Sequence, residues 1–372
     1  MLRGVNEKFC VMIAAGGTGG HVFPGVAIAE ELRSASPGAR IMFAGTERGL
    51  EAKILPREGW PLLLMNSSSI KDRKGFARFA AWARLPFSIA RALLILVAER
   101  PHILVSIGGY AAGPLSIAAW MMRIPVLLVE PNAVPGMTNL KLGRFARRVC
   151  VAFDEAARRF APGKALITGV PVRKKVLEAR KEKPAGEGRT SIFLFGGSQG
   201  ALTLNRAMID SLPQLAGLGE KLRVIHQTGS NDDTEAIAQA YASAKVDAKV
   251  FAFTEKIWEC YADSDVVIGR SGANTVGEVA ALGIPSILVP YPYAADDHQR
   301  ANAEWLVASG GAAMIPDAQC NGERLARELK AIVTDKVRMK TMASCAAKAG
   351  RPDAAKRIAE ECLRLTGRGK GV

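Results

Sequence analysis

The chain of 372 residues has little of what marks secreted, metal-binding or nucleic-acid-binding proteins. Its six cysteines form no Cys-x-x-Cys pair and have no histidine-rich neighbourhood, which indicates reduced, mostly buried thiols of a cytosolic protein. Aromatic residues make up only 6% of the chain, too few to indicate stacking platforms for bases. The apolar run 9–15 is short and leads into a glycine loop rather than a cleavage site, which argues against a signal peptide.

A long hydrophobic span is missing as well. Residues 103–122 carry no charge, but Gly108-Gly109 and Gly113-Pro114 would break a membrane-spanning helix near its centre. We therefore expect a strand over 103–107, a loop, and a helix over 115–122.

Two common nucleotide-binding signatures are also absent. No Gly-Lys-Ser/Thr follows a glycine loop, which excludes a P-loop, and neither main glycine loop has the G-x-G-x-x-G spacing of a dinucleotide site. No acidic residue ends the strand expected over 40–44, where a dinucleotide site would need one for the ribose.

What the chain does have is one design used twice, an apolar strand that breaks into a glycine-rich loop and then opens a helix. The two loops are Gly16-Gly17-Thr18-Gly19-Gly20-His21 and Gly196-Gly197-Ser198-Gln199-Gly200-Ala201. Glycines let a ligand approach the backbone, and the start of the following helix favours negative charge. For either loop alone, a tight turn without a ligand is the alternative interpretation.

Strand-like and helix-like segments alternate through both halves, which predicts an α/β protein with two Rossmann-like, doubly wound parallel sheets. We expect an N-terminal domain over 1–170, joined by a C-terminal helix within 353–372, a charged linker over 171–190, and a second domain over 191–352. Ligands of such sheets bind beyond the carboxyl ends of the strands, so the two loops should line a cleft between facing domains. The expected strands are 9–15, 40–44, 61–65, 103–107, 125–129, 148–152, 165–168, 191–195, 222–226, 248–251, 265–269, 285–289 and 312–315.

The net charge of +15 is distributed unevenly. Residues 1–170 contain 22 Lys and Arg against 11 Asp and Glu, whereas residues 191–372 contain 21 of each. A basic N-terminal half implies an anionic partner, which could be nucleic acid, an anionic membrane or an acidic substrate.

A third turn follows the strand over 265–269. Ser271 and Gly272 can present hydroxyl and backbone donors to a phosphate, and the carboxylate of Glu278, about a turn into the next helix, can hold a sugar diol. A helix-terminal role for Glu278 is the alternative. Together with the two loops, this turn favours a nucleotide sugar as the ligand.

The chain resembles the MurG family of bacterial N-acetylglucosaminyltransferases along nearly its whole length. The motifs that support this resemblance are Gly16-Gly17-Thr18-Gly19-Gly20-His21-Val22-Phe23-Pro24, Gly108-Gly109-Tyr110, Glu130-Pro131-Asn132, Pro171-Val172-Arg173, Gly196-Gly197-Ser198-Gln199-Gly200-Ala201, Arg270-Ser271-Gly272-Ala273 and Asp297-His298-Gln299-Arg300-Ala301-Asn302-Ala303.

The resemblance implies a GT-B fold and an inverting transfer of N-acetylglucosamine from UDP-N-acetylglucosamine to the muramyl sugar of an undecaprenyl-diphosphate-linked precursor. It implies no cofactor, and a peripheral place at the cytoplasmic face of the plasma membrane. Another GT-B enzyme for a UDP-sugar, with a different acceptor or with epimerase activity, is the alternative function.

Residue roles are likewise implied by the resemblance. Thr18, Gly19 and Gly20 would lie at the sugar-phosphate junction and the acceptor, and Asn132 and Gln299 would contact the sugar. Arg173 and Ser198 would contact the diphosphate, Ile257 the uracil and Glu278 the ribose. The chain departs from the family at Pro131, usually Gln, and at Val170, usually Asn; the first puts one polar sugar contact in question.

Transfer to a hydroxyl needs a base, and the chain has four histidines. His21 closes the first glycine loop and is the best candidate, with a capping or merely orienting histidine as the alternative. His298 is a candidate for substrate contact, whereas His102 and His226 adjoin strands and are interpreted as structural.

Asp263-Ser264-Asp265 matches the D-x-D pattern of metal-binding sites. Because Asp263 ends an expected helix and Asp265 precedes a strand, far from its carboxyl end, we interpret the pair as a helix-to-strand turn and expect no metal.

Residues 70–85 interleave Phe76, Phe79, Trp82 and Leu85 at a spacing of three with cations, and we expect this helix to stop at Pro86. Residues 71–148 contain 12 basic and 3 acidic residues, so this segment is predicted to contact anionic membrane lipid. An ordinary amphipathic core helix is the alternative. Nucleic acid is not expected as a partner, because it would leave the glycine loops unexplained.

Overall fold

The computed structural model describes residues 8–47, 49–65, 76–109, 111–179 and 188–368, without the side chains of residues 76–84, 219 and 220. The chain divides into two compact units. Unit 1 comprises Met1–Arg173 and Asp353–Val372, and unit 2 comprises Lys174–Pro352. The expected cleft between two facing domains remains a prediction.

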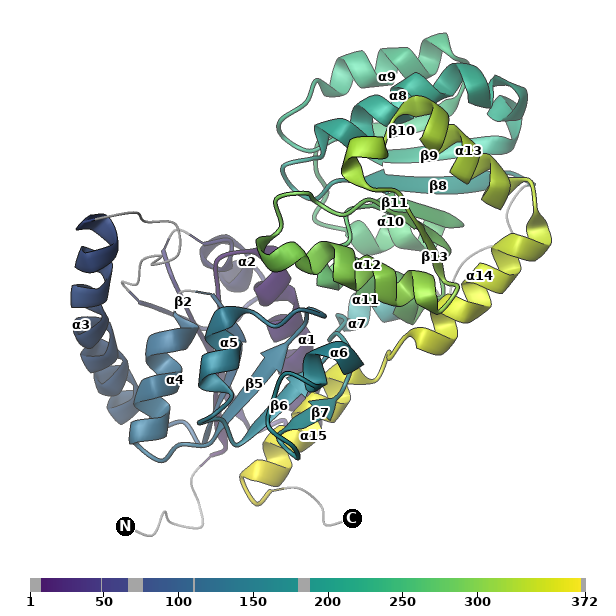
Figure 1. The fold of residues 1–372 in the computed structure, drawn as a ribbon. Coiled ribbons are helices and arrows are strands. Elements are labelled where there is room, and N and C mark those ends of the chain that lie inside the picture. The colour runs from purple at the N-terminus through teal and green to yellow at the C-terminus, as the bar shows by residue number, and fades with distance from the viewer. Residues whose placement is uncertain (1–7, 48, 66–75, 110, 180–187, 369–372) are drawn as a thin grey trace. The chain divides into compact units, whose positions relative to one another are not determined.

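Unit 1 has, within the described residues, a seven-stranded parallel sheet in the order β3-β2-β1-β4-β5-β6-β7. The neighbouring strands β5 and β6 of this sheet are labelled in Figure 1. The strand order reverses between β1 and β4, which is where sheets of this kind bind their ligands. Its strands are β1 (Cys10–Ala15), β2 (Arg40–Gly45), β3 (Leu62–Leu64), β4 (Ile103–Gly108), β5 (Val126–Glu130), β6 (Arg148–Val151) and β7 (Ala165–Ile167). Its helices are α1 (Gly19–Ala35), α2 (Glu51–Arg57), α3 (Phe76–Glu99), α4 (Ala112–Met121), α5 (Met137–Leu142), α6 (Asp154–Ala157) and α15 (Ala354–Leu365).

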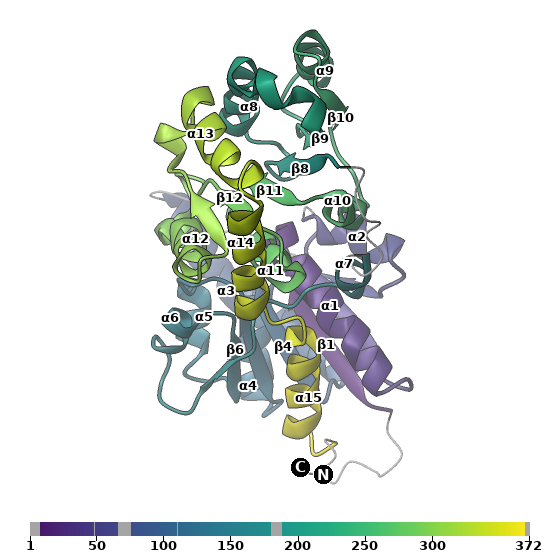
Figure 2. The ribbon, with the colours of Figure 1, turned by 90° about the vertical axis from the view of Figure 1, so that its right-hand side faces the viewer.

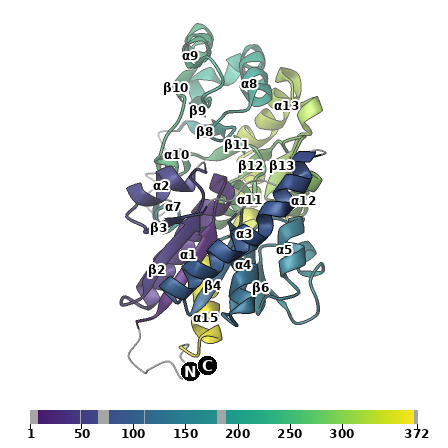
Figure 3. The same cartoon turned by 90° about the vertical axis from the view of Figure 1, so that its left-hand side faces the viewer.

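Helices cover both faces of this sheet because successive strand residues point to opposite sides. Val11 and Ile13 of β1 pack into the cluster that contains Ile358 of α15, which lies beside α1 (Figure 2). Met12 of β1 packs into the other cluster, with Leu96 of α3; there α3 runs beside α4 (Figure 3). The C-terminal helix thus completes the core of unit 1.

Unit 2 repeats the plan with a six-stranded parallel sheet, within the described residues, in the order β10-β9-β8-β11-β12-β13. Its reversal point lies between β8 and β11. The strands are β8 (Thr190–Phe195), β9 (Leu222–Gln227), β10 (Asp247–Phe251), β11 (Val266–Gly269), β12 (Ser286–Leu288) and β13 (Ala312–Met314). The helices are α7 (Lys174–Ala179), α8 (Leu202–Leu215), η2 (Ala216–Lys221), α9 (Thr234–Ser243), α10 (Ile257–Asp263), α11 (Ala273–Leu282), η3 (Ala295–Asp297), α12 (His298–Ala308), η4 (Asp317–Gln319), α13 (Gly322–Val333) and α14 (Lys336–Ala349).

The fold class predicted from the sequence is confirmed, but two helix boundaries were wrong. The helix expected after the first glycine loop in fact begins within it, at Gly19, so Gly19 and Gly20 form the first turn of α1. Pro86 does not end a helix, because α3 continues through it from Phe76 to Glu99. Proline has no N–H to donate to the carbonyl one turn earlier in the helix. Because Pro86 is exposed, that carbonyl can be hydrogen-bonded by water instead.

The uncharged stretch 103–122 forms β4, a turn and α4, as expected. In the described parts of the chain, no helix combines the length and the apolar character needed to cross a bilayer. All six cysteines are free thiols, and five of them are buried. Burial raises the pKa of the Cys260 and Cys320 thiols to about 11, so both stay protonated near neutral pH.

Candidate active site

The first glycine loop lies at the carboxyl end of β1, at the reversal point of the sheet in unit 1. Gly17 has φ +94°, which glycine adopts without the cost that other residues would meet. Thr18 is the N-cap of α1, but its side chain makes no capping hydrogen bond and is exposed. Gly19 and Gly20 open the helix. These three predicted site residues are therefore brought together at a helix N-terminus, a position that attracts anions and hydroxyl groups.

His21 is held between the loops that follow β1 and β4. Its Nδ1 lies 3.1 Å from the carbonyl oxygen of Gly16. A carbonyl can only accept a hydrogen bond, so Nδ1 carries the proton and, in the neutral ring, Nε2 carries the lone pair. A Cβ added to Gly108, which has φ +142°, would lie 2.7 Å from Nε2, so position 108 has room only for glycine. The ring is thus set in the tautomer that a base at Nε2 requires.

A buried carboxylate that the sequence did not single out lies under this loop. Glu51, the first residue of α2, is fully buried, and its Oε2 accepts the Gly17 N–H at 2.8 Å. Its Oε1 accepts the N–H of Thr46 at 2.7 Å and the Thr46 hydroxyl at 2.9 Å. The three donors are neutral, and the described residues place no cation within ion-pair distance of Glu51.

A second buried carboxylate fixes the loop that contains Asn132. Glu130, at the end of β5, accepts the backbone N–H of Asn132 at 3.0 Å and its side-chain amide at 3.3 Å. The N–H of Gly136 and the amide of Asn139 also donate to Glu130. Burial raises the pKa of the Glu130 carboxyl, while these hydrogen bonds act in the opposite direction. Asn132, the predicted sugar contact, is therefore positioned by a carboxylate to which the sequence analysis gave no role.

Arg173 is the last residue of unit 1 and is almost completely buried. Its guanidinium stacks over the ring of Phe23, 4.0 Å from the centroid, two residues beyond His21 on α1. This contact places Arg173, the residue predicted to bind the diphosphate, next to the first glycine loop. Val170, which departs from the family pattern, is buried, so its apolar side chain fits its surroundings.

The second glycine loop lies at the carboxyl end of β8. Gly197 has φ +93°, and Ser198 is exposed at the tip of the loop. Gln227, at the end of β9, donates from its side-chain amide to the Gly197 carbonyl at 3.1 Å and accepts the Thr254 N–H at 3.3 Å. One buried amide thus joins the loop to the segment just before Ile257, the predicted uracil contact at the start of α10. Sequence reasoning missed Gln227.

Glu278 lies on α11 and is buried. Its Oε2 accepts the hydroxyl proton of Tyr261, on α10, at 2.8 Å. The Tyr261 ring packs edge-on against Phe193 and Phe195 of β8. The carboxylate is therefore held from one side by a rigid phenol, which no sequence signal had indicated.

Gln299 follows a strained turn at the start of α12. Asp296 and Asp297 have φ of +55° and +51°, a left-handed conformation that is costly for residues other than glycine. The Gln299 side-chain oxygen accepts the N–H of Tyr291 at 3.0 Å, and its backbone carbonyl accepts the Ser271 hydroxyl at 2.8 Å. The turn thus ties the predicted sugar contact to the Ser271-Gly272 turn at the start of α11.

The Asp263-Ser264-Asp265 sequence lies away from these loops. The backbone N–H of Asp265 donates to the Ser191 carbonyl at 2.7 Å, and its Oδ2 accepts the Ser191 N–H at 3.0 Å. Ser191 is near the start of β8, so this pair lies at the amino ends of the strands. The interpretation as a helix-to-strand turn is confirmed. Within the described residues, no group of three or more His, Cys, Asp and Glu side chains could hold a metal ion.

The other histidines also have defined places. His102 accepts the Cys10 N–H at 3.1 Å beside β1, and His226 is buried between Tyr241 and Asn205. Burial lowers the pKa of His226 to about 4, so its ring is neutral at neutral pH. Both are structural, as interpreted from the sequence. His298 bonds through Nδ1 to the Ala295 carbonyl at 2.7 Å within the strained turn.

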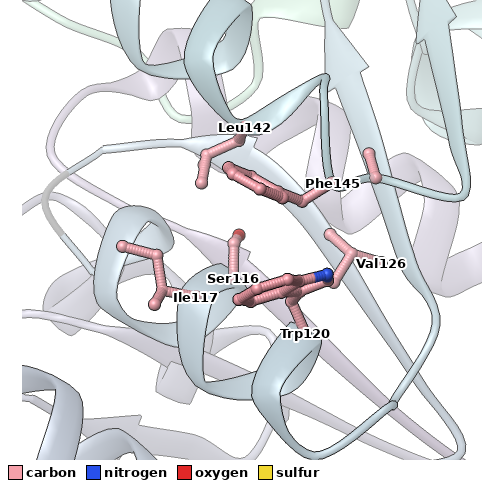
Figure 4. Close-up of a pocket in the computed structure, with 7 residues that line it drawn as sticks. Ser116, Ile117, Trp120, Val126, Leu142 and Phe145 are labelled. Atoms are coloured by element: carbon pink, nitrogen blue, oxygen red, sulfur yellow. The ribbon is translucent and has the colours of Figure 1, made fainter.

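The predicted membrane segment is only partly visible. The side chains of Phe76, Phe79 and Trp82 lie outside the described residues, and Leu85 is half-buried on α3. Beside α4, an apolar cavity of about 210 Å³ has the rings of Trp120 and Phe145 in its wall, with centroids 4.8 Å apart (Figure 4). Both rings are about half exposed. Other exposed apolar side chains of α3 and α4 are Phe87, Leu94, Val97 and Met121.

Comparison with known proteins covers both units. The glycosyltransferase family 28 N-terminal domain matches residues 11–151, and the C-terminal domain of the same family matches residues 191–358. A UDP-N-acetylglucosamine--N-acetylmuramyl-(pentapeptide) pyrophosphoryl-undecaprenol N-acetylglucosamine transferase of Anaeromyxobacter sp. (strain Fw109-5) is 42% identical over 358 residues, 96% of this chain and 94% of that protein. A protein of the same name from Myxococcus xanthus (strain DK1622) is 39% identical, over 95% of this chain and 92% of that protein.

Solved structures agree with this result. The crystal structure of Acinetobacter baumannii MurG has a TM-score of 0.77 and 31% identity, covering 96% of this chain and 100% of that one. A UDP-N-acetylglucosamine 2-epimerase has a TM-score of 0.69 over 98% of both chains but only 16% identity, which shows a shared fold alone.

Proposed function

The chain belongs to glycosyltransferase family 28, and from this membership we propose that it transfers N-acetylglucosamine from UDP-N-acetylglucosamine to the muramyl sugar of undecaprenyl-diphosphate-linked muramyl-pentapeptide, converting lipid I to lipid II. The observation that carries the proposal is the match, over at least 95% of the chain, to relatives named for this reaction. Unit 1 and unit 2 each supply a glycine loop at the reversal point of its own sheet, which supports this proposal.

The reaction assigned to these residues is a single inverting displacement. The acceptor hydroxyl oxygen forms a bond to the anomeric carbon while the bond from that carbon to the diphosphate oxygen breaks, and its electron pair leaves with UDP. Nε2 of His21 takes the hydroxyl proton. Glu278 binds the ribose, Ile257 the uracil, Ser198 and Arg173 the diphosphate, and Asn132 and Gln299 the sugar; Thr18, Gly19 and Gly20 receive the acceptor.

The donor should be chosen by its N-acetyl-bearing sugar. We expect UDP-N-acetylglucosamine to be used at least tenfold better in kcat/KM than UDP-glucose, because the amide of Asn132, fixed by Glu130, has a defined partner only in the correct sugar. A transfer assay with each labelled donor and the lipid-linked acceptor measures this ratio. Equal turnover of the two donors would defeat the assignment. Formation of an epimerised UDP-sugar in place of the transfer product would make the chain an epimerase instead.

Transfer should not depend on a divalent metal ion. Asp265 is engaged by the Ser191 backbone at the amino end of the sheet, away from the loops that receive the diphosphate. We expect activity in excess chelator to stay within about twofold, with helix N-termini and Arg173 balancing the departing charge. Complete loss of transfer in chelator, with an equally inactive but folded Asp265→Asn variant, would show instead that the D-x-D holds a metal.

We further propose that unit 1 docks peripherally on anionic lipid through the face that contains α3 and α4. The sequence of the first half of α3 contains Phe76, Phe79, Trp82 and Leu85, and the exposed side chains of Phe87, Trp120 and Phe145 add apolar surface in the same unit. The exposed cations nearby in sequence include Arg91, Arg100, Arg123, Lys141, Arg144 and Arg147. Attraction of each to anionic lipid is worth about 1 kcal/mol and is screened by salt.

This docking is tested by co-sedimentation with vesicles. Binding should require anionic lipid, weaken with salt, and fall several-fold in a Phe79→Ser/Trp82→Ser double variant. Val337→Ser, which removes a 75% exposed apolar side chain from α14 in unit 2, is the matched control and should bind as the wild type does. Equal binding to neutral and anionic vesicles, or an unchanged folded double variant, would exclude this segment as the anchor.

A further inference from the structure

The peptide group between Gly16 and Gly17 is engaged at both of its ends. Its carbonyl accepts the Nδ1 proton of His21 at 3.1 Å, and its N–H donates to Oε2 of Glu51 at 2.8 Å. Because the six atoms of a peptide group are coplanar and conjugated, carboxylate, amide and imidazole form one continuous chain of hydrogen bonds.

The space around Glu51 is built for a carboxylate. Cβ atoms added to Gly16, Gly45 or Gly49 would come within 2.6, 2.5 and 1.9 Å of its side chain, so three glycines enclose it. Both oxygens are hydrogen-bonded, and the side chain has no exposed surface. Among the residues that the structure describes, no cation pairs with Glu51. Burying an unpaired acid costs several kcal/mol, a cost that a neutral side chain would avoid at a purely structural position.

We propose that Glu51 is a positioning residue for His21 and acts on it through the Gly16–Gly17 peptide. This inference rests on the proposed role of His21 as the base. The negative charge at the N–H end polarises the amide and makes the Gly16 carbonyl a stronger acceptor. The Nδ1–H tautomer is thereby favoured, and the imidazolium formed when Nε2 takes the acceptor's hydroxyl proton is stabilised. A direct carboxylate–histidine pair does the same work without the intervening amide.

The other charged groups around His21 act less directly. The first two turns of α1 contain no charged residue. The residue of β4 that lies next to the His21 ring is Gly108, which is uncharged. Arg173 stacks over Phe23, two residues beyond His21, and a cation in this region can only disfavour an imidazolium. On α15, which packs on α1, the buried Glu361 is paired with Arg148 and Arg364. Glu51 is the acid linked to the ring by hydrogen bonds.

Nitrogen-15 NMR of histidine-labelled protein tests the inference without an activity assay. The His21 signals, assigned by their loss in His21→Ala, should report the Nδ1–H tautomer, whereas neutral histidine in water carries its proton mainly on Nε2. In Glu51→Gln the His21 pKa should fall by roughly half a unit, less than the 1–3 units of a directly contacting charge. Glu51→Asp keeps the charge, so the His21 pKa of this variant should lie between those of the wild type and of Glu51→Gln. Thr46→Val removes a hydroxyl donor from the same carboxylate and should not lower the His21 pKa.

Kinetics supply the second readout. Glu51→Gln should lower kcat about threefold in the presence of His21, as half a pKa unit implies, but should leave it unchanged in a His21→Ala background, because the effect passes through the ring. Equal losses in both backgrounds, an Nε2–H tautomer in the unmodified protein, or a His21 pKa unmoved in Glu51→Gln would each overturn the proposal. If Glu51→Gln does not fold, the wild-type tautomer and the Glu51→Asp pKa still decide it. Absence of transfer by the wild type would refute the proposed function and leave these NMR results unaffected.

Discussion

Replacing His21 by alanine should lower kcat by a factor of roughly 10² to 10⁴, the usual contribution of a positioned general base. The affinity for UDP should change by less than about twofold, since the ribose and uracil contacts assigned above lie in unit 2. A base acts mainly in the transition state, so its loss appears in kcat rather than in ground-state binding. Initial rates with labelled UDP-N-acetylglucosamine and calorimetry with UDP separate the two quantities.

His298 provides the matched control for this prediction. Its Nδ1 is also bonded to a backbone carbonyl, that of Ala295, so both histidines have the same tautomeric constraint although they lie in different units. We expect His298→Ala to affect the donor KM more than kcat, because the residue neighbours Gln299 in the sugar-contacting turn. Near-normal turnover of His21→Ala at every pH would require the base to be sought elsewhere.

The parts of the site that the sequence predicted are those defined by local backbone demands. Gly17 and Gly197 are needed because their φ angles of +94° and +93° suit only glycine, and this need is visible in the sequence directly after each strand. The alternation of strands and helices is equally local, because it depends on the hydrophobic period of each segment. Both loops lie at the reversal points of their own sheets, so the position of each loop followed from the topology of its unit.

The side chains that fix those loops could not be predicted, because they come from distant parts of the chain. Glu51 is 34 positions from Gly17, and Gln227 is 30 positions from Gly197. A single acid or amide near the end of a short segment has the same appearance in a sequence whether it is buried or exposed. Its role arises only when two neighbouring strands place it under the loop. Pro86 is the converse case, a strong local signal overridden because its position on α3 is exposed.

Replacing Glu278 by glutamine should weaken UDP binding by a factor of roughly 10 to 100. Hydrogen bonds to a charged group contribute about 1.5–3 kcal/mol, and the ribose diol would lose a charged acceptor. The Gln side chain keeps the volume of Glu at this buried position on α11, so the core around Tyr261 should remain packed. Tyr261→Phe removes only the phenol that holds Oε2 and should give a smaller loss, of about threefold to tenfold, because the carboxylate remains but is less well oriented.

Deoxy-nucleotides make the Glu278 prediction specific to the ribose. The wild type should bind 2′-deoxy-UDP and 3′-deoxy-UDP more weakly than UDP, since one hydroxyl of the diol is missing. In Glu278→Gln most of that difference should disappear, because a contact already lost with the carboxylate cannot be lost again with the hydroxyl. Tyr261→Phe should retain part of the discrimination. Calorimetry of the three nucleotides against the three proteins completes the cycle. A folded Glu278→Gln variant that discriminates between UDP and its deoxy forms as strongly as the wild type would place the ribose contact on another residue.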